Sequence, residues 1–180
     1  MTTFDEFSSN LLEEAKRFYE IAKETSDVTA KKAYLHASLL ISISSLEAFI
    51  NGISNDFKNA SSLSLFENSF LQEKEIEFKN GDFLITNRLK MSRLTERIEF
   101  LFRKFNKTRL DKRAKWWQNL KEGISLRNNI VHPKEYHEIQ EKHIEATLKA
   151  VIECINKLFL AIYKKKLPSI NMGLDSKLTF

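Results

Sequence analysis

Cysteine, glycine and proline are scarce in this chain of 180 residues, which has one, four and two of them. The lone Cys154 cannot form an internal disulfide, and no secretory signal pattern is present, so we expect a cytoplasmic protein. Few glycines and prolines mean few tight turns, which favours long helices. The most apolar stretch, residues 33–53, contains Glu47, Asn51 and several serines, so the sequence predicts no contact with a membrane.

Metal ligands at a recognisable spacing are also missing. The histidines His36, His137 and His143 show no ligand spacing with cysteines or carboxylates. The sequence therefore predicts no metal site, and no pattern in it indicates a cofactor.

What the chain does contain is a large apolar fraction of 42%, including 14 phenylalanines, as in a packed globular protein. Apolar residues recur at helical spacing in five segments, the longest of which spans residues 29–57. We therefore predict an all-α fold, an up-and-down bundle of about five helices, forming a single domain over residues 1–166. Residues 167–180 contain Pro168 and Gly173 and are expected to form a loosely ordered tail.

Residues 58–87 allow two interpretations. Asn80-Gly81 separates apolar pairs on either side, which is typical of a hairpin with a type I′ turn. The alternative is a helix over residues 66–78 that stops at this dipeptide. We favour the helix, because Glu73, Lys74, Glu75 and Glu77 are poor strand residues.

An arginine occupies an inward position near the end of the fourth predicted helix. The stripe of that helix is Trp117, Leu120, Ile124, Arg127 and Val131. A guanidinium in such a stripe must be paired, or must face a cavity or another chain. Pro133 ends the helix just after His132, whose imidazole can then approach Arg127 or Asn128. A permanent cation, an amide and a group that titrates near neutrality suit phosphate chemistry. The same two side chains can simply cap the helix, by binding its last carbonyls.

A polar stripe of Ser44, Glu47 and Asn51 crosses the otherwise apolar second helix. A buried glutamate needs a partner, and Arg127 is the obvious one. The pair either fixes the register of two helices or aims the arginine, and we favour the structural role.

Basic residues are concentrated between Arg88 and Lys115, where eleven stand against three acidic ones, an excess of eight in a chain of net charge +5. This basic segment can be an ordinary solvated face, or it can bind a phosphate backbone. The residues predicted to contact RNA are Arg103, Lys104, Lys107, Arg109, Lys112 and Arg113.

Two stretches together resemble the HEPN superfamily (higher eukaryotes and prokaryotes nucleotide-binding). They are the sequence AYLHA at residues 33–37 followed by SLEAFIN at 45–51, and LRNNIVHP at 126–133. The hallmark of the superfamily is an arginine, then a polar residue, then a histidine after four to six intervening positions. Here four residues intervene between Arg127 and His132, and Asn128 supplies the polar position. The resemblance covers about residues 30–165.

The resemblance implies an all-α homodimer in which the motifs of both subunits face one cleft. It also implies metal-independent RNA cleavage to 2′,3′-cyclic phosphate ends, in a toxin or defence effector with a possible separate antitoxin protein. By position, His132 would handle a proton, Arg127 would stabilise charge on the phosphate and Asn128 would position it. Glu47 would support Arg127, with Ser44 and Asn51 beside it.

Two alternatives to this enzyme remain. One is a non-catalytic HEPN module that binds a partner protein or a nucleotide in the same cleft. The other is a basic protein that binds RNA without cleaving it, for which His132 would be dispensable.

Overall fold

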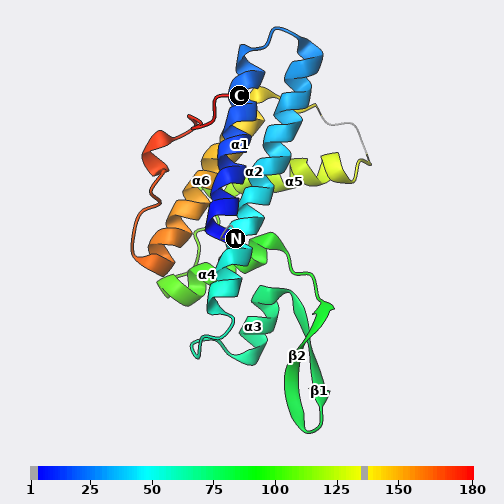
Figure 1. The fold of residues 1–180 in the computed structure, drawn as a ribbon, viewed down its shortest axis with the longest axis vertical. Coiled ribbons are helices and arrows are strands. Elements are labelled where there is room, and N and C mark those ends of the chain that lie inside the picture. The colour runs from blue at the N-terminus through cyan, green and yellow to red at the C-terminus, as the bar shows by residue number, and fades with distance from the viewer. Residues whose placement is uncertain (1–3, 135–137) are drawn as a thin grey trace.

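The computed structural model describes residues 4–134 and 138–180 (Figure 1). The helices are α1 (Phe4–Glu24), α2 (Val28–Phe57), α3 (Leu65–Gln72), α4 (Leu94–Asn106), α5 (Lys115–Val131) and α6 (Glu141–Tyr163). The strands β1 (Lys74–Lys79) and β2 (Asp82–Leu89) form a hairpin, and Ile170–Met172 form a 3-10 helix. The predicted helical class is therefore confirmed in its main part. The strictly all-α prediction is wrong, because the chain has a two-stranded sheet.

Helix α2 is the central element of the bundle, against which α1, α5 and α6 pack (Figure 1). Its apolar side chains Leu39, Ile43, Leu46 and Ile50 are completely buried. The helix begins where the carboxylate of Asp27 accepts hydrogen bonds from two backbone N–H groups of the first turn. By length and composition alone, α2 is apolar enough to cross a membrane. More than half of its most apolar window is buried inside the structure.

Helix α5 is buried near its start and becomes more exposed toward its end. Trp117 and Leu120 in its first half are buried, and Gly123 lies so close to α6 that an added Cβ would meet the side chain of Thr147. Further on, the sides of α5 are only partly covered, and Val131 at its end is exposed. Figure 1 shows this end pointing away from the bundle. The inward stripe predicted from the sequence is therefore buried at its start and half-exposed at its end.

The predicted helix over residues 66–78 is wrong beyond Gln72. Helix α3 ends there, Glu73 adopts a left-handed conformation with φ of 53°, and β1 follows. Asn80 and Gly81 both have positive φ and turn the chain into β2, which places Phe78 opposite Phe83. The asparagine-glycine turn and these cross-strand apolar pairs outweigh the poor strand propensity of the acidic residues.

A buried arginine anchors the base of this hairpin to the bundle. The guanidinium of Arg97, on α4, pairs with Glu73 at 3.0 Å and donates to the Asn51 amide oxygen at 2.7 Å and the Leu71 carbonyl at 2.8 Å. Burial lowers the pKa of Arg97, while Glu73 and Glu47 act in the opposite direction. Arg97 therefore joins three elements and does not belong to the basic surface on which the charge count places it.

The segment after residue 166 runs back along α1. Lys16 of α1 is buried and donates to the Asp175 carbonyl at 2.7 Å, and the backbone N–H of Lys177 donates to the Glu13 carboxylate at 2.7 Å. The residues for which the sequence predicts a loose tail thus make defined contacts with the bundle.

Replacing Arg97 by leucine is expected to lower the free energy of unfolding by about 3 kcal/mol, because it leaves Glu73 and three other acceptors without their buried cation. Urea denaturation monitored by circular dichroism measures this change. Arg103→Leu is the matched control, since Arg103 is exposed on the same helix, and we expect it to change stability by about 0.5 kcal/mol or less. Equal effects of the two substitutions would contradict the anchoring role.

Candidate active site

Arg127 and Glu47 form an ion pair between α5 and α2, as the sequence predicts. The Arg127 side chain is 22% exposed and that of Glu47 39%, so the pair lies at the surface of the bundle and not within it. One terminal nitrogen of the guanidinium binds the carboxylate, and Nε is buried with no hydrogen-bond partner. No other described residue binds the second terminal nitrogen, which remains able to donate to an anion.

His132 ends helix α5 and is exposed to solvent. Its backbone N–H donates to the Asn128 carbonyl at 2.8 Å, and its φ of −129° takes it out of the helix. Within the described residues, no hydrogen bond joins its imidazole to Arg127 or to Asn128. The structure therefore places the three predicted catalytic residues on the last turns of one helix, with His132 and Asn128 open to solvent.

The two predicted supporting residues of α2 do not contact Arg127. Ser44 donates to the Leu40 carbonyl of its own helix at 3.0 Å, and Asn51 accepts from Arg97. Ser44 and Asn51 lie about one turn to either side of Glu47. Of the three predicted supporting residues, Glu47 is the one that pairs with Arg127.

The basic residues predicted to bind RNA lie at the other end of α5. They occupy the last turn of α4 and the connection to Lys115, whereas Arg127 lies about 18 Å further along the helix by its rise per residue. Two of the six are already paired, Lys104 with Glu67 at 2.9 Å and Lys112 with Glu99 at 2.7 Å.

Three of the remaining four, Lys107, Arg109 and Arg113, are exposed, and their side chains make no hydrogen bond or ion pair within the described residues. Arg103 donates to the Lys107 carbonyl at 2.9 Å. The structure thus does not bring this basic segment together with the arginine and histidine.

Other catalytic groups are not assembled in the described part of the chain. No group of three or more metal-ligating side chains occurs there, and His137 lies outside the described residues. Burial raises the pKa of the Cys154 thiol, so it offers no thiolate nucleophile.

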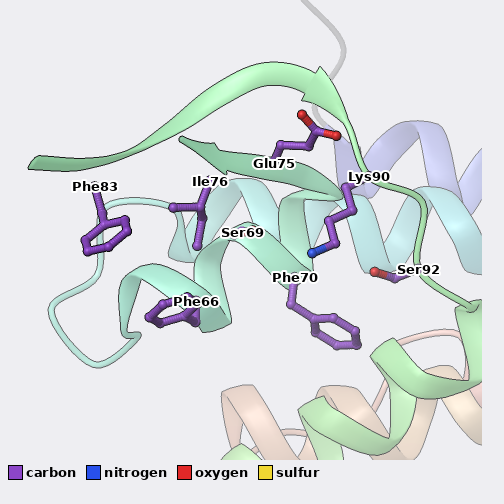
Figure 2. A pocket seen from close by; sticks show the side chains of 8 residues that line it. All are labelled: Phe66, Ser69, Phe70, Glu75, Ile76, Phe83, Lys90 and Ser92. Carbon is purple, nitrogen blue, oxygen red and sulfur yellow. The ribbon is translucent and has the colours of Figure 1, made fainter. Parts of the chain in front are cut away.

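A cleft of about 520 Å³ between α3 and the hairpin was not predicted (Figure 2). Phe66, Phe83 and Lys90 are among its lining residues. The signal in the sequence is Asn80-Gly81 between alternating apolar residues, which indicates a ribbon with one apolar face.

Comparisons of this chain with protein-family models, with curated proteins and with solved structures find no match.

Replacing Arg127 by leucine is expected to lower the free energy of unfolding by about 1 kcal/mol or less, since partly exposed ion pairs contribute little to stability. Glu47→Gln should behave in the same way. Urea denaturation measures the free energy of unfolding of each variant, and the loss caused by Arg97→Leu serves as the reference. A loss at Arg127 as large as that at Arg97 would assign the Arg127 pair a structural role.

Proposed function

We propose that this protein is a metal-independent endoribonuclease of HEPN type, whose active site lies at the exposed end of α5. The observation that supports it best is the ion pair between Arg127 of α5 and Glu47 of α2. His132 lies five residues after Arg127, at a solvent-exposed helix end. A partly exposed, oriented guanidinium and an accessible imidazole at the end of one helix suit the stabilisation and cleavage of a phosphodiester.

Each residue has a distinct role in this proposal. His132 takes the proton of the attacking 2′-hydroxyl or gives one to the leaving 5′-oxygen. Arg127 stabilises the charge that develops on the phosphate, and Glu47 holds its guanidinium in place. Asn128 positions the strand. The 2′-oxygen forms a bond to phosphorus as the bond to the 5′-oxygen breaks, so the products are a 2′,3′-cyclic phosphate and a free 5′-hydroxyl and no water is consumed in this step.

Among the described residues, His132 is the one imidazole at this site, whereas the reaction needs both a base and an acid. A two-fold homodimer through the ends of α5 supplies the second His132. Val131, next to His132, is an exposed apolar side chain at this end of α5 that suits such a contact, whereas Leu126 and Ile130 pack against the core of the bundle. In a cell, such a nuclease would act as a toxin or defence effector controlled by a separate antitoxin protein.

The decisive experiment is RNA cleavage by the purified protein in EDTA. We expect the wild type to cleave single-stranded RNA and leave cyclic phosphate ends. His132→Ala should slow cleavage by about 100- to 10,000-fold, through loss of proton transfer. Arg127→Ala should slow it by about 100- to 1,000-fold, through loss of charge stabilisation. Gel analysis of labelled RNA before and after phosphatase treatment measures rate and end chemistry together.

Two variants serve as matched controls for this assay. His143→Ala removes a histidine that only caps α6, and Arg17→Ala removes an arginine with a similar exposure and one glutamate partner. Both should cleave at the wild-type rate. Activity of His132→Ala equal to that of the wild type, in a folded protein, would refute the proposed mechanism.

The dimer is tested by sedimentation velocity at micromolar concentrations. We expect a dimer for the wild type and a monomer for Val131→Glu, because the new charge lies in the proposed contact. Val28→Glu is the control, since Val28 is exposed at the start of α2, where an acidic residue is favourable. A monomeric wild type would remove the composite site.

The alternative function is a non-catalytic helical module that uses the end of α5 to bind a partner protein or a nucleotide. It is favoured by one observation, namely that within the described residues the imidazole of His132 makes no hydrogen bond with Arg127 or Asn128. A stable dimer with no cleavage by any variant would select it.

A further inference from the structure

The hairpin and its surroundings expose more apolar surface than the rest of the described chain. More than half of the exposed large apolar side chains lie between residues 66 and 91, namely Phe66, Phe78, Phe83, Leu84, Leu89 and Met91. Figure 1 shows the hairpin extending away from the helical bundle, with only α3 beside it. Apolar side chains at such a density mark a surface that binds something.

Part of this surface is concave. The cleft of about 520 Å³ lies between α3 and the apolar face of β1 and β2, and has the volume of a small-ligand site. In Figure 2, Phe66, Ile76 and Phe83 gather at one end, and Lys90 and Ser92 lie at the other. The rings of Phe66 and Phe83 are 69% and 57% exposed, so they line the cleft without filling it.

Lys90 is the one cation among the described residues that line the cleft. The Glu73 carboxylate beside Ser92 is already paired with Arg97 at 3.0 Å. Within the described residues, the Lys90 amine makes no ion pair or hydrogen bond, and Figure 2 shows the Glu75 carboxylate directed away from it. Arg88 and Arg93 are exposed and lie within three residues of Lys90 in the chain. An anion at this end therefore meets an unpaired cation, while an aromatic ring at the other end meets phenylalanine faces.

We propose that this cleft binds one unpaired nucleotide of a single-stranded RNA, with its base against Phe66 and Phe83 and its phosphate at Lys90. Stacked rings beside a cation are how proteins hold unpaired nucleotides without strict sequence preference. A protein segment would cover the apolar rings but would leave the Lys90 amine without a partner unless it carried an acid there. The inference rests on the proposed function in taking RNA as the substrate, and it adds a binding site remote from the reacting groups.

The test is RNA affinity measured by fluorescence anisotropy with a labelled short oligoadenylate. The full chain carries His132→Ala throughout, so that the probe stays intact. Phe66→Leu and Phe83→Leu should each weaken binding by about 5- to 100-fold, the range expected for one stacked base. Lys90→Ala should weaken binding and reduce the slope of log affinity against log salt by about one phosphate contact.

Two hairpin variants outside the cleft are the controls. Leu84→Ala removes an exposed apolar side chain, and Lys79→Ala removes an exposed cation, and neither residue lines the cleft. Both should bind like the parent. A matched oligonucleotide with abasic sites throughout should bind more weakly to the parent, and Phe83→Leu should cause no further loss with that probe.

Several outcomes would overturn the proposal. Unchanged affinity of the Phe66, Phe83 and Lys90 variants would exclude the cleft from RNA binding. Equal losses of RNA affinity in the cleft variants and the control variants would show that binding depends on the hairpin as a whole and not on the cleft. Adenosine monophosphate binding as tightly as the oligonucleotide would make a free nucleotide the ligand.

If Phe83→Leu changes the oligomeric state seen by sedimentation but leaves RNA affinity unchanged, the cleft is a contact between protein chains instead. None of these results depends on catalysis. The proposed cleavage at His132 can therefore be confirmed while nucleotide binding in the cleft is refuted, and the reverse is also possible.

Discussion

The two arginines that organise this molecule both depend on one side of helix α2. Glu47 accepts from Arg127 of α5, and one turn later Asn51 accepts from Arg97 of α4. Much of the C-terminal half of the helix is buried among apolar side chains, and the polar stripe that contains Glu47 and Asn51 is where it pairs with these arginines. Glu47 also acts on the pKa of Arg97, so the two cations share one electrostatic environment. The end of α5 and the base of the hairpin thus each have an arginine paired to the same stripe of α2.

The two pairs nevertheless serve different purposes, and burial decides which. The Arg97 side chain is only 4% exposed, and it is held by one carboxylate and three neutral acceptors. Loss of such a group leaves desolvated acceptors behind, so its contribution is to stability. Arg127 is far more accessible and has one carboxylate partner. A surface pair of this kind stabilises a fold little, but it holds a cation in a defined direction with donors left for a ligand.

The sequence predicts the parts of this arrangement that depend on spacing within one helix, and not those that depend on how separate helices pack. Helical periodicity identifies α2, α5 and the Glu47–Arg127 pair, because each follows from spacing along one helix plus the need to pair a charge. It cannot distinguish which of two arginines reaches Asn51, since that depends on how α4 packs. The hairpin is one of the two interpretations that the sequence allows, and strand propensity alone favours the helix. The turn at Asn80-Gly81 and the anchoring of the hairpin base by Arg97 outweigh that propensity.

The separation of the groups that we propose bind phosphate would constrain the kind of RNA that this protein accepts. The basic segment before Lys115 and Arg127 lie at opposite ends of α5, and the cleft that contains Phe83 belongs to the hairpin. A duplex keeps its bases stacked inside, so it could use the basic segment but could not place a base on an aromatic ring. Attack by a 2′-hydroxyl on its own phosphate also requires a backbone free to rotate into line. Both the chemistry proposed at His132 and the shape of the cleft therefore favour a flexible, unpaired strand.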